Sequence, residues 1–88
     1  MTKAITKRLN GMRDNPASVS FSDALRVAEH YFGKYRISGS HYVFKTPWIG
    51  DPRINLQKAK HGSAKAYQVQ QLLRAIDLLM GVKGGDHG

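Results

Sequence analysis

The segment from Lys34 to Lys45 constrains the fold of this chain more than any other. Two short alternating runs flank Gly39-Ser40, and a two-residue connection with glycine first predicts a β-hairpin closed by a type II′ turn. Pairing Ser38 with His41 sets the register, because residues that face each other across two strands share one side of the sheet. The apolar side then carries Tyr35, Ile37, Tyr42 and Phe44. The basic side carries Lys34, Arg36, Ser38, His41, Val43 and Lys45.

The basic side of this hairpin belongs to a chain that is basic as a whole. Its 88 residues include 14 Lys plus Arg against 6 Asp plus Glu, a formal net charge of +8. Between residues 33 and 65 there are seven basic residues and a single acid, Asp51. This excess favours a polyanionic partner, nucleic acid above all. A generic solvated basic surface remains an alternative.

Composition also narrows the class of protein. The length suits one small domain, and the lack of cysteine removes disulfides and thiolate metal sites. No apolar run approaches the ~20 residues of a membrane span, and the first residues lack the apolar segment of a signal peptide. The six acids are scattered and form no cluster with histidine. We therefore expect a cytoplasmic protein without a metal, a small-molecule cofactor or a membrane partner.

The first fifteen residues predict a short accessory helix. Ile5, Leu9 and Met12 form one narrow apolar stripe, and the other positions are largely basic or polar. Asp14-Asn15-Pro16 ends the helix, since proline removes a donor and disfavours helix in the preceding residue. Three roles stay open for this helix: docking on the core, contact with RNA phosphates, or fraying.

A second helix is expected to begin near Ser20 and to end at Gly33. Ser20 or Ser22 can cap its free amide groups, and Asp23 suits its first turn. Its core-facing stripe is Phe21, Ala24, Leu25, Ala28 and Phe32. His30 lies off this stripe, so we expect it at the surface.

The hairpin is followed by an irregular segment and a third strand. The two prolines of Thr46–Pro52 forbid regular structure, and Trp48 there favours packing on the core over stacking on an exposed base. Arg53–Gln57 alternates again, which predicts a strand with Ile54 and Leu56 facing inward.

The C-terminal part predicts one more helix. A basic connector, residues 58–63, leads to a cap at Ser63. The apolar stripe of the helix is Tyr67, Val69, Leu72, Leu73, Ile76, Leu79 and Met80. Gly81 begins the exit, and residues 82–88, including His87, should form a flexible tail without a role of their own. Residues 16–81 then form an α+β domain with a three-stranded antiparallel sheet and two helices on one face. The other face stays wet and basic.

The order of these motifs resembles the HicA family. The resemblance runs from about Phe21 to Leu79 and rests on five stretches. They are Phe21-Ser-Asp, the turn Gly39-Ser40-His41 with Tyr42-Val43-Phe44, the strand Ile54-Asn55-Leu56, Ala66-Tyr67-Gln68-Val69, and the helix end Leu72-Leu-Arg-Ala-Ile76. HicA proteins are toxins of bacterial type II toxin–antitoxin pairs, small ribonucleases that cleave mRNA and are held inactive by a HicB antitoxin.

The resemblance implies a fold like that of double-stranded-RNA-binding domains, α-β-β-β-α, and a catalytic role for His41. Judged by its own surroundings, His41 would rather be an exposed or structural residue. Two departures from the family stand out. The chain has about twenty residues before the region of resemblance, and Tyr42 stands where many members carry a second histidine.

The implied chemistry is cleavage of RNA by its own 2′-hydroxyl. A histidine with an ordinary pKa of about 6.5 can take or give a proton near neutral pH. His41 is then the general acid or base, and no metal is needed. The expected RNA-binding residues are Lys34, Arg36, Gly39, Ser40, Lys45, Arg53, Lys60 and Lys65. The expected partners are mRNA and a HicB-like antitoxin that covers the basic face.

Two other functions remain compatible with the sequence. A non-catalytic module could bind the RNA backbone by shape through the basic sheet face, without depending on His41. The same face could also serve mainly to recognise an acidic protein.

Overall fold

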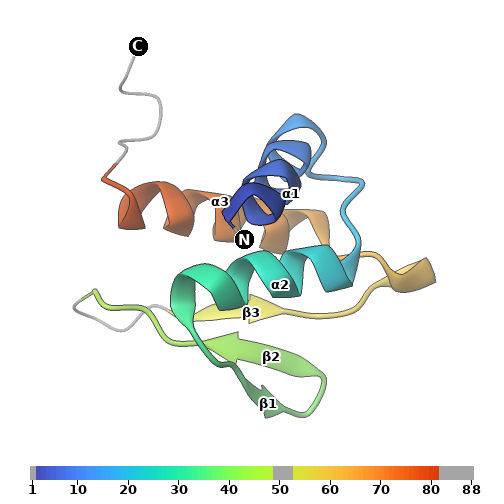
Figure 1. Cartoon of the computed structure of the whole chain (residues 1–88). Coiled ribbons are helices and arrows are strands. Elements are labelled where there is room, and N and C mark those ends of the chain that lie inside the picture. The colour runs from blue at the N-terminus through green and yellow to red at the C-terminus, as the bar shows by residue number, and fades with distance from the viewer. Residues whose placement is uncertain (1, 49–52, 82–88) are drawn as a thin grey trace.

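The elements of the chain follow one another in the predicted order. The computed structural model describes residues 2–48 and 53–81, which form an α+β fold (Figure 1). Its elements are α1 (Thr2–Asp14), α2 (Phe21–Phe32), β1 (Arg36–Ser38), β2 (His41–Phe44), β3 (Ile54–Leu56), the 3-10 turn η1 (Lys60–Gly62) and α3 (Ala66–Leu79). The three strands form an antiparallel sheet in the order β1-β2-β3. The predicted α+β class is confirmed.

The hairpin has the predicted register. Ser38 pairs with His41, and Ile37 with Tyr42. Gly39 has φ 61, whereas Ser40 does not have a positive φ, as a type II′ turn requires. The turn residues and the alternation therefore predict this local structure correctly.

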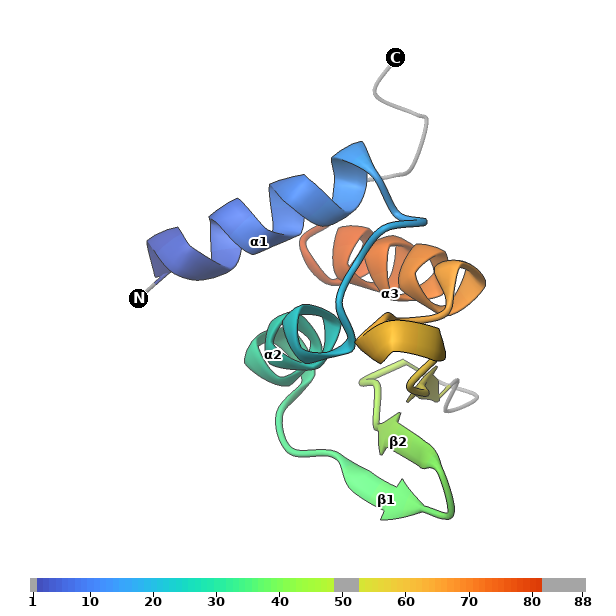
Figure 2. The same ribbon diagram turned by 90° about the vertical axis from the view of Figure 1, so that its right-hand side faces the viewer.

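Two helices cover one face of the sheet. In Figure 2, α2 and α3 lie above the strands, with α2 in contact with β2 and β3, and α3 in contact with β3. The largest fully buried side chains between these layers and around them are Phe44, Met12, Leu56, Leu72, Ile76, Val27 and Val69. β1 lies beyond the reach of this core, and Ile37 is 56% exposed although its side of the hairpin is apolar. Ile37 lies on the expected apolar side of the hairpin but is not covered, because the helices pack on β2 and β3.

The N-terminal helix docks on the core. α1 crosses over α2 and α3 on the side away from the sheet (Figure 2) and buries Leu9 and Met12. Arg8 Nε donates to Asp23 Oδ1 at 3.1 Å, which ties α1 to α2. Of the three roles left open by the sequence, docking is the one observed.

Helix α2 begins and ends as predicted. The Oγ of Ser20, and not that of Ser22, accepts a hydrogen bond from the backbone N–H of Asp23 at 3.1 Å. Gly33 adopts φ 84 and donates its N–H to the carbonyl of Glu29. His30 is exposed, as expected. These caps satisfy backbone groups that a helix end leaves without an internal partner.

Helix α3 differs from the prediction in its cap and in its buried stripe. Lys65 is the N-cap residue, and the Ser63 hydroxyl donates instead to the carbonyl of Lys60 at 2.7 Å. Tyr67 is 56% exposed, and Leu79 and Met80 are exposed as well. Gln68 and Ala75 are buried in their place. Gln68 can be buried because it hydrogen-bonds to Gln57, the residue directly after β3.

Trp48 packs on the fold. It is half-buried, and its ring meets that of Phe32 edge-on with 6.1 Å between centroids. Residues 49–52 of the predicted irregular segment and the predicted flexible tail with His87 lie outside the described residues. In the part of the chain that the structure describes, no helix has the length and apolar character needed to cross a membrane.

Candidate nucleic-acid interface

His41 occupies the tip of the hairpin on the face that the helices leave uncovered. It is the first residue of β2, directly after the Gly39-Ser40 turn, and its side chain is exposed. A Cβ built on Gly39 would meet no atom within 4 Å, so the backbone of the turn stands open to solvent. An approaching phosphate group can therefore reach the imidazole and the turn amides together.

The imidazole of His41 has no hydrogen-bond or ion-pair partner within residues 2–48 and 53–81. Its nearest neighbour across the strands is Ser38, whose side chain is also exposed. The structure thus presents His41 to solvent without fixing the tautomer or the orientation of its ring.

Two of the expected RNA-binding lysines share this end of the molecule. The pairing of Tyr42 with Leu56 means that the chain after β3 leaves the sheet beside the hairpin turn. Figure 1 shows η1 and the starts of α2 and α3 at that same end. Lys60 opens η1 and is exposed, and Lys65 caps α3. The fold brings these two cations to the end that carries His41, although more than twenty residues separate Lys65 from it in sequence.

The other expected cations lie toward the opposite end of the hairpin or along its strands. Lys34 and Lys45 flank the open end of the hairpin, four residues from Ser38 and His41, which is about 13 Å at ~3.3 Å per residue. Arg53 precedes β3 at the same open end, since Ile54 pairs with Phe44. Arg36 lies between the two ends, opposite Val43. The structure therefore separates the expected site into a tip, with His41, and an open end, with Lys34 and Lys45.

Two basic residues near the tip were missing from the expected site. The Nζ of Lys58 lies 5.7 Å from the ring centroid of Phe21, a cation–π contact at the start of α2. His61 is exposed and adopts φ 58, the left-handed region that few side chains occupy. Both follow β3, and the register of β3 with β2 is the signal that could have placed them beside the hairpin turn.

An acid near this end is already paired. Asp23 lies in the first turn of α2, and Arg8 binds its carboxylate. Asp77 of α3 similarly accepts two hydrogen bonds from the Arg13 guanidinium, at 2.6 and 3.3 Å. These pairings reduce the negative field that an approaching polyanion would meet.

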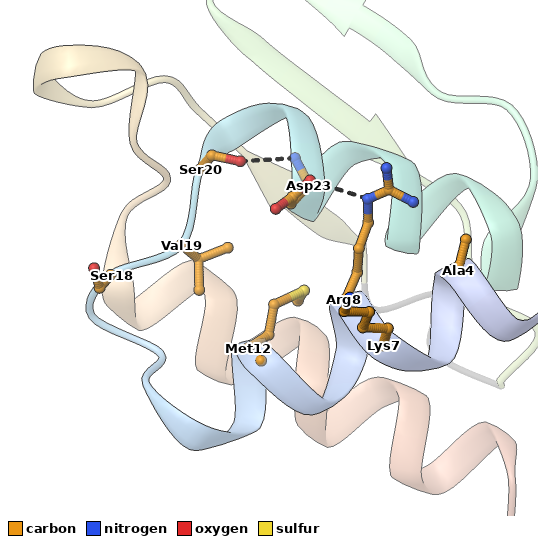
Figure 3. A pocket seen from close by; sticks show the side chains of 9 residues that line it. Ala4, Lys7, Arg8, Met12, Ser18, Val19, Ser20 and Asp23 are labelled. Atoms are coloured by element: carbon orange, nitrogen blue, oxygen red, sulfur yellow. Dashed lines mark hydrogen bonds and ion pairs between the residues drawn. The ribbon is translucent and has the colours of Figure 1, made fainter.

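A hollow of about 530 Å³ lies elsewhere, between α1 and the segment that enters α2 (Figure 3). Its walls include Lys7, Arg8, Ser18 and Ser20, and Met12 lies at its base. None of the expected site residues lines it. Among the described residues, no three His, Asp or Glu side chains lie close enough together to hold a metal ion.

The fold and this surface define a small basic α+β domain with an exposed histidine at the tip of its hairpin. No family model, no curated protein and no solved structure matches the chain.

Proposed function

We propose that this protein is a metal-independent endoribonuclease that cleaves mRNA with His41 as general acid or base. The supporting observation is the position of His41, exposed beside an open glycine turn on the uncovered face of the sheet. The resemblance to HicA proteins supports the further proposal that it is the toxin of a type II toxin–antitoxin pair.

The reaction asks little of the protein. The 2′-hydroxyl of the RNA attacks the adjacent phosphorus, the bond to the 5′-oxygen breaks, and a 2′,3′-cyclic phosphate results. His41 accepts the proton of the 2′-hydroxyl or donates one to the leaving 5′-oxygen, and water or a lysine carries the other proton. General acid–base catalysis of this kind contributes about 10²–10⁴-fold in rate. The modest contribution of a single histidine predicts a slow enzyme.

The basic residues would act at two places along the RNA. Lys60 in η1 and Lys65 before α3 would hold phosphates beside the helices. The amides of Gly39 and Ser40 at the tip can stabilise charge on the phosphorane. Arg36, and beyond it Lys34 and Lys45, would hold phosphates further along the strand. Arg53 belongs to the same open end. In this proposal the tip carries the chemistry and the open end positions the substrate.

Neutralisation would follow from covering the basic face. A HicB-like antitoxin with an acidic surface would meet the same cations that bind RNA and would block access to His41. RNA and antitoxin would then compete for one surface.

A second candidate function, RNA binding without cleavage, is favoured by one specific observation. No described group orients the imidazole of His41, whereas catalytic histidines are commonly held by a hydrogen bond from the ring to a neighbour.

One experiment separates the two functions. Purified protein, free of any bound partner, is incubated with an unstructured RNA in excess EDTA, beside His41→Ala and the matched control His30→Ala, which alters another exposed histidine. Cleavage is followed on a gel and RNA binding by titration. We expect the wild type and His30→Ala to cut, and His41→Ala to lose about 10²–10⁴-fold in rate while it still binds.

The opposite results are equally clear. Cleavage by His41→Ala at the wild-type rate would remove His41 from the chemistry. Equal binding by all three proteins without any cleavage would favour the RNA-binding module.

A further inference from the structure

The two edge strands of the sheet, β1 and β3, differ in whether their outward backbone groups have hydrogen-bond partners. At the edge formed by β3, Gln57 donates its backbone N–H to Gln68 Oε1 at 2.8 Å, and its own side-chain oxygen accepts from Gln68 Nε2 at 2.9 Å. Just beyond, Ala59 N–H donates to the carbonyl of Ser63 at 2.7 Å. Groups that would otherwise be open to another strand are thereby occupied at this end of β3.

The edge formed by β1 lacks such cover. Within the described residues, β1 pairs with β2 alone, and all three of its residues are exposed. Ser38 and His41 flank a two-residue turn, so this pair exchanges both backbone hydrogen bonds. Pairs alternate along an antiparallel ladder, so the N–H and C=O of Ile37 point away from β2. An extended chain alongside β1 would find a donor and an acceptor there.

The side chains around this edge indicate what kind of chain fits. Ile37 is 56% exposed, which leaves an apolar surface beside the open backbone groups. Lys34 and Arg36 precede it in the chain, and residues 33–48 contain no acid. A second copy of this protein would bring like charges together, and RNA lacks the amide groups that continue a β-ladder. An acidic, extended protein segment satisfies the charge, the apolar surface and the backbone.

We propose that the outer edge of β1 is a docking site for an extended acidic segment of a partner protein, which adds a fourth strand to the sheet. The residue opposite Ile37 exchanges both backbone hydrogen bonds with it and is apolar. Its neighbours on the incoming strand are acidic and face Arg36 across the ladder. The contact does not require ribonuclease activity, so it stands or falls separately from the proposed function.

The test uses the full chain and an eight-residue peptide of alternating glutamate and valine, with capped ends and no RNA present. Binding is titrated by NMR, and exchange of the backbone amides with solvent is measured in parallel. We expect shifts centred on residues 35–38 and slowed exchange of the Ile37 N–H.

Ile37→Pro removes the outward N–H while leaving the bonds from β1 to β2 in place, since proline is tolerated on an edge strand. The dissociation constant of the peptide for Ile37→Pro should be about tenfold higher or more, because the variant lacks the backbone hydrogen bond that adds the new strand. Ile37→Thr keeps the N–H and serves as the matched control, with a change of less than about threefold. A peptide N-methylated at the pairing amides carries the same charge. Its affinity for the wild type should be as low as that of the unmodified peptide for Ile37→Pro.

The N-methylated peptide tests the same hydrogen bond on the wild-type protein, so the result does not depend on the folding of Ile37→Pro. Equal binding of the two peptides to the wild type would overturn the proposal, because the contact would then be electrostatic only. So would the absence of protection at Ile37, or protection that rises with protein concentration without peptide, which would identify a second copy as the occupant.

Discussion

Gln68 is a buried polar side chain that links α3 to the residue directly after β3. Gln68 is only 3% exposed, and its amide forms hydrogen bonds with both the backbone and the side chain of Gln57. A buried amide is stable only when its donors and acceptors are satisfied. The hydrogen bonds to Gln57 therefore allow the Gln68 amide to be buried.

At this scale we predict that Gln68→Leu destabilises the protein. Leucine has a similar size, so the change removes the hydrogen bonds while it keeps most of the packing, and it leaves the Gln57 N–H without its partner. The loss should be about 1–3 kcal/mol in the free energy of unfolding, measured by urea denaturation. Gln70→Leu on the exposed side of α3 is the control and should change stability by less than about 0.5 kcal/mol. Equal effects of the two substitutions would contradict the role given to Gln68.

Among the elements, α1 is held on the domain by both apolar packing and ion pairs, and the two contribute unequally to stability. Met12 of α1 is only 2% exposed. The paired side chains of Arg13 and Asp77 are 35% and 21% exposed. A buried methionine contributes through its contacts and through the water it excludes. A partly exposed ion pair contributes little, because solvent screens it. The apolar contact should dominate.

We accordingly predict that Met12→Ala costs about 2–5 kcal/mol and that Arg13→Ala costs at most about 1 kcal/mol. Thermal and urea unfolding would measure both, with Asn10→Ala, on the exposed side of α1, as the control. Added salt should reduce the effect of Arg13→Ala and leave that of Met12→Ala unchanged. A larger loss from Arg13→Ala than from Met12→Ala would show that α1 is held mainly by charge.

Over the whole molecule, the positive charge is spread over several elements and is not confined to the hairpin turn. Lys60 and Lys65 belong to η1 and to the start of α3, and Lys34 and Lys45 lie at the open end of the hairpin, about 13 Å from Ser38 and His41 at ~3.3 Å per residue. An RNA strand that contacts both pairs would release counterions at each phosphate contact.

The prediction at this scale concerns the salt dependence of RNA binding. Lys60→Ala/Lys65→Ala and Lys34→Ala/Lys45→Ala should each lower the slope of log K against log salt by about 1.4, at ~0.7 for each lost contact with single-stranded RNA. Binding titrations at several salt concentrations would measure these slopes. The matched control is Lys3→Ala/Lys7→Ala, two exposed lysines on α1, which lies on the side of the helices away from the sheet. A slope change seen with only one of these two double variants would show that the RNA contacts only that pair of lysines.

The local features of this protein can be derived from its sequence. The glycine at the first turn position and the alternation around it determine the hairpin and its register, and Ser20 and Gly33 determine the ends of α2. The element order and the α+β class follow in the same way. These features depend on interactions between residues close in sequence, whose geometry is limited by backbone sterics and by the period of strand and helix.

Only the tertiary structure decided which predicted surfaces are covered and which cations meet. Ile37 is exposed because the helices pack on β2 and β3, and Gln68 is buried because its hydrogen-bond partner, Gln57, follows β3. The chain that carries Lys60 and Lys65 leaves the sheet on the side of the hairpin turn because β3 runs antiparallel to β2, whereas Lys34 and Lys45 lie at the open end of the hairpin. Packing and pairing between segments far apart in the chain set these outcomes, and local periodicity carries no information about them.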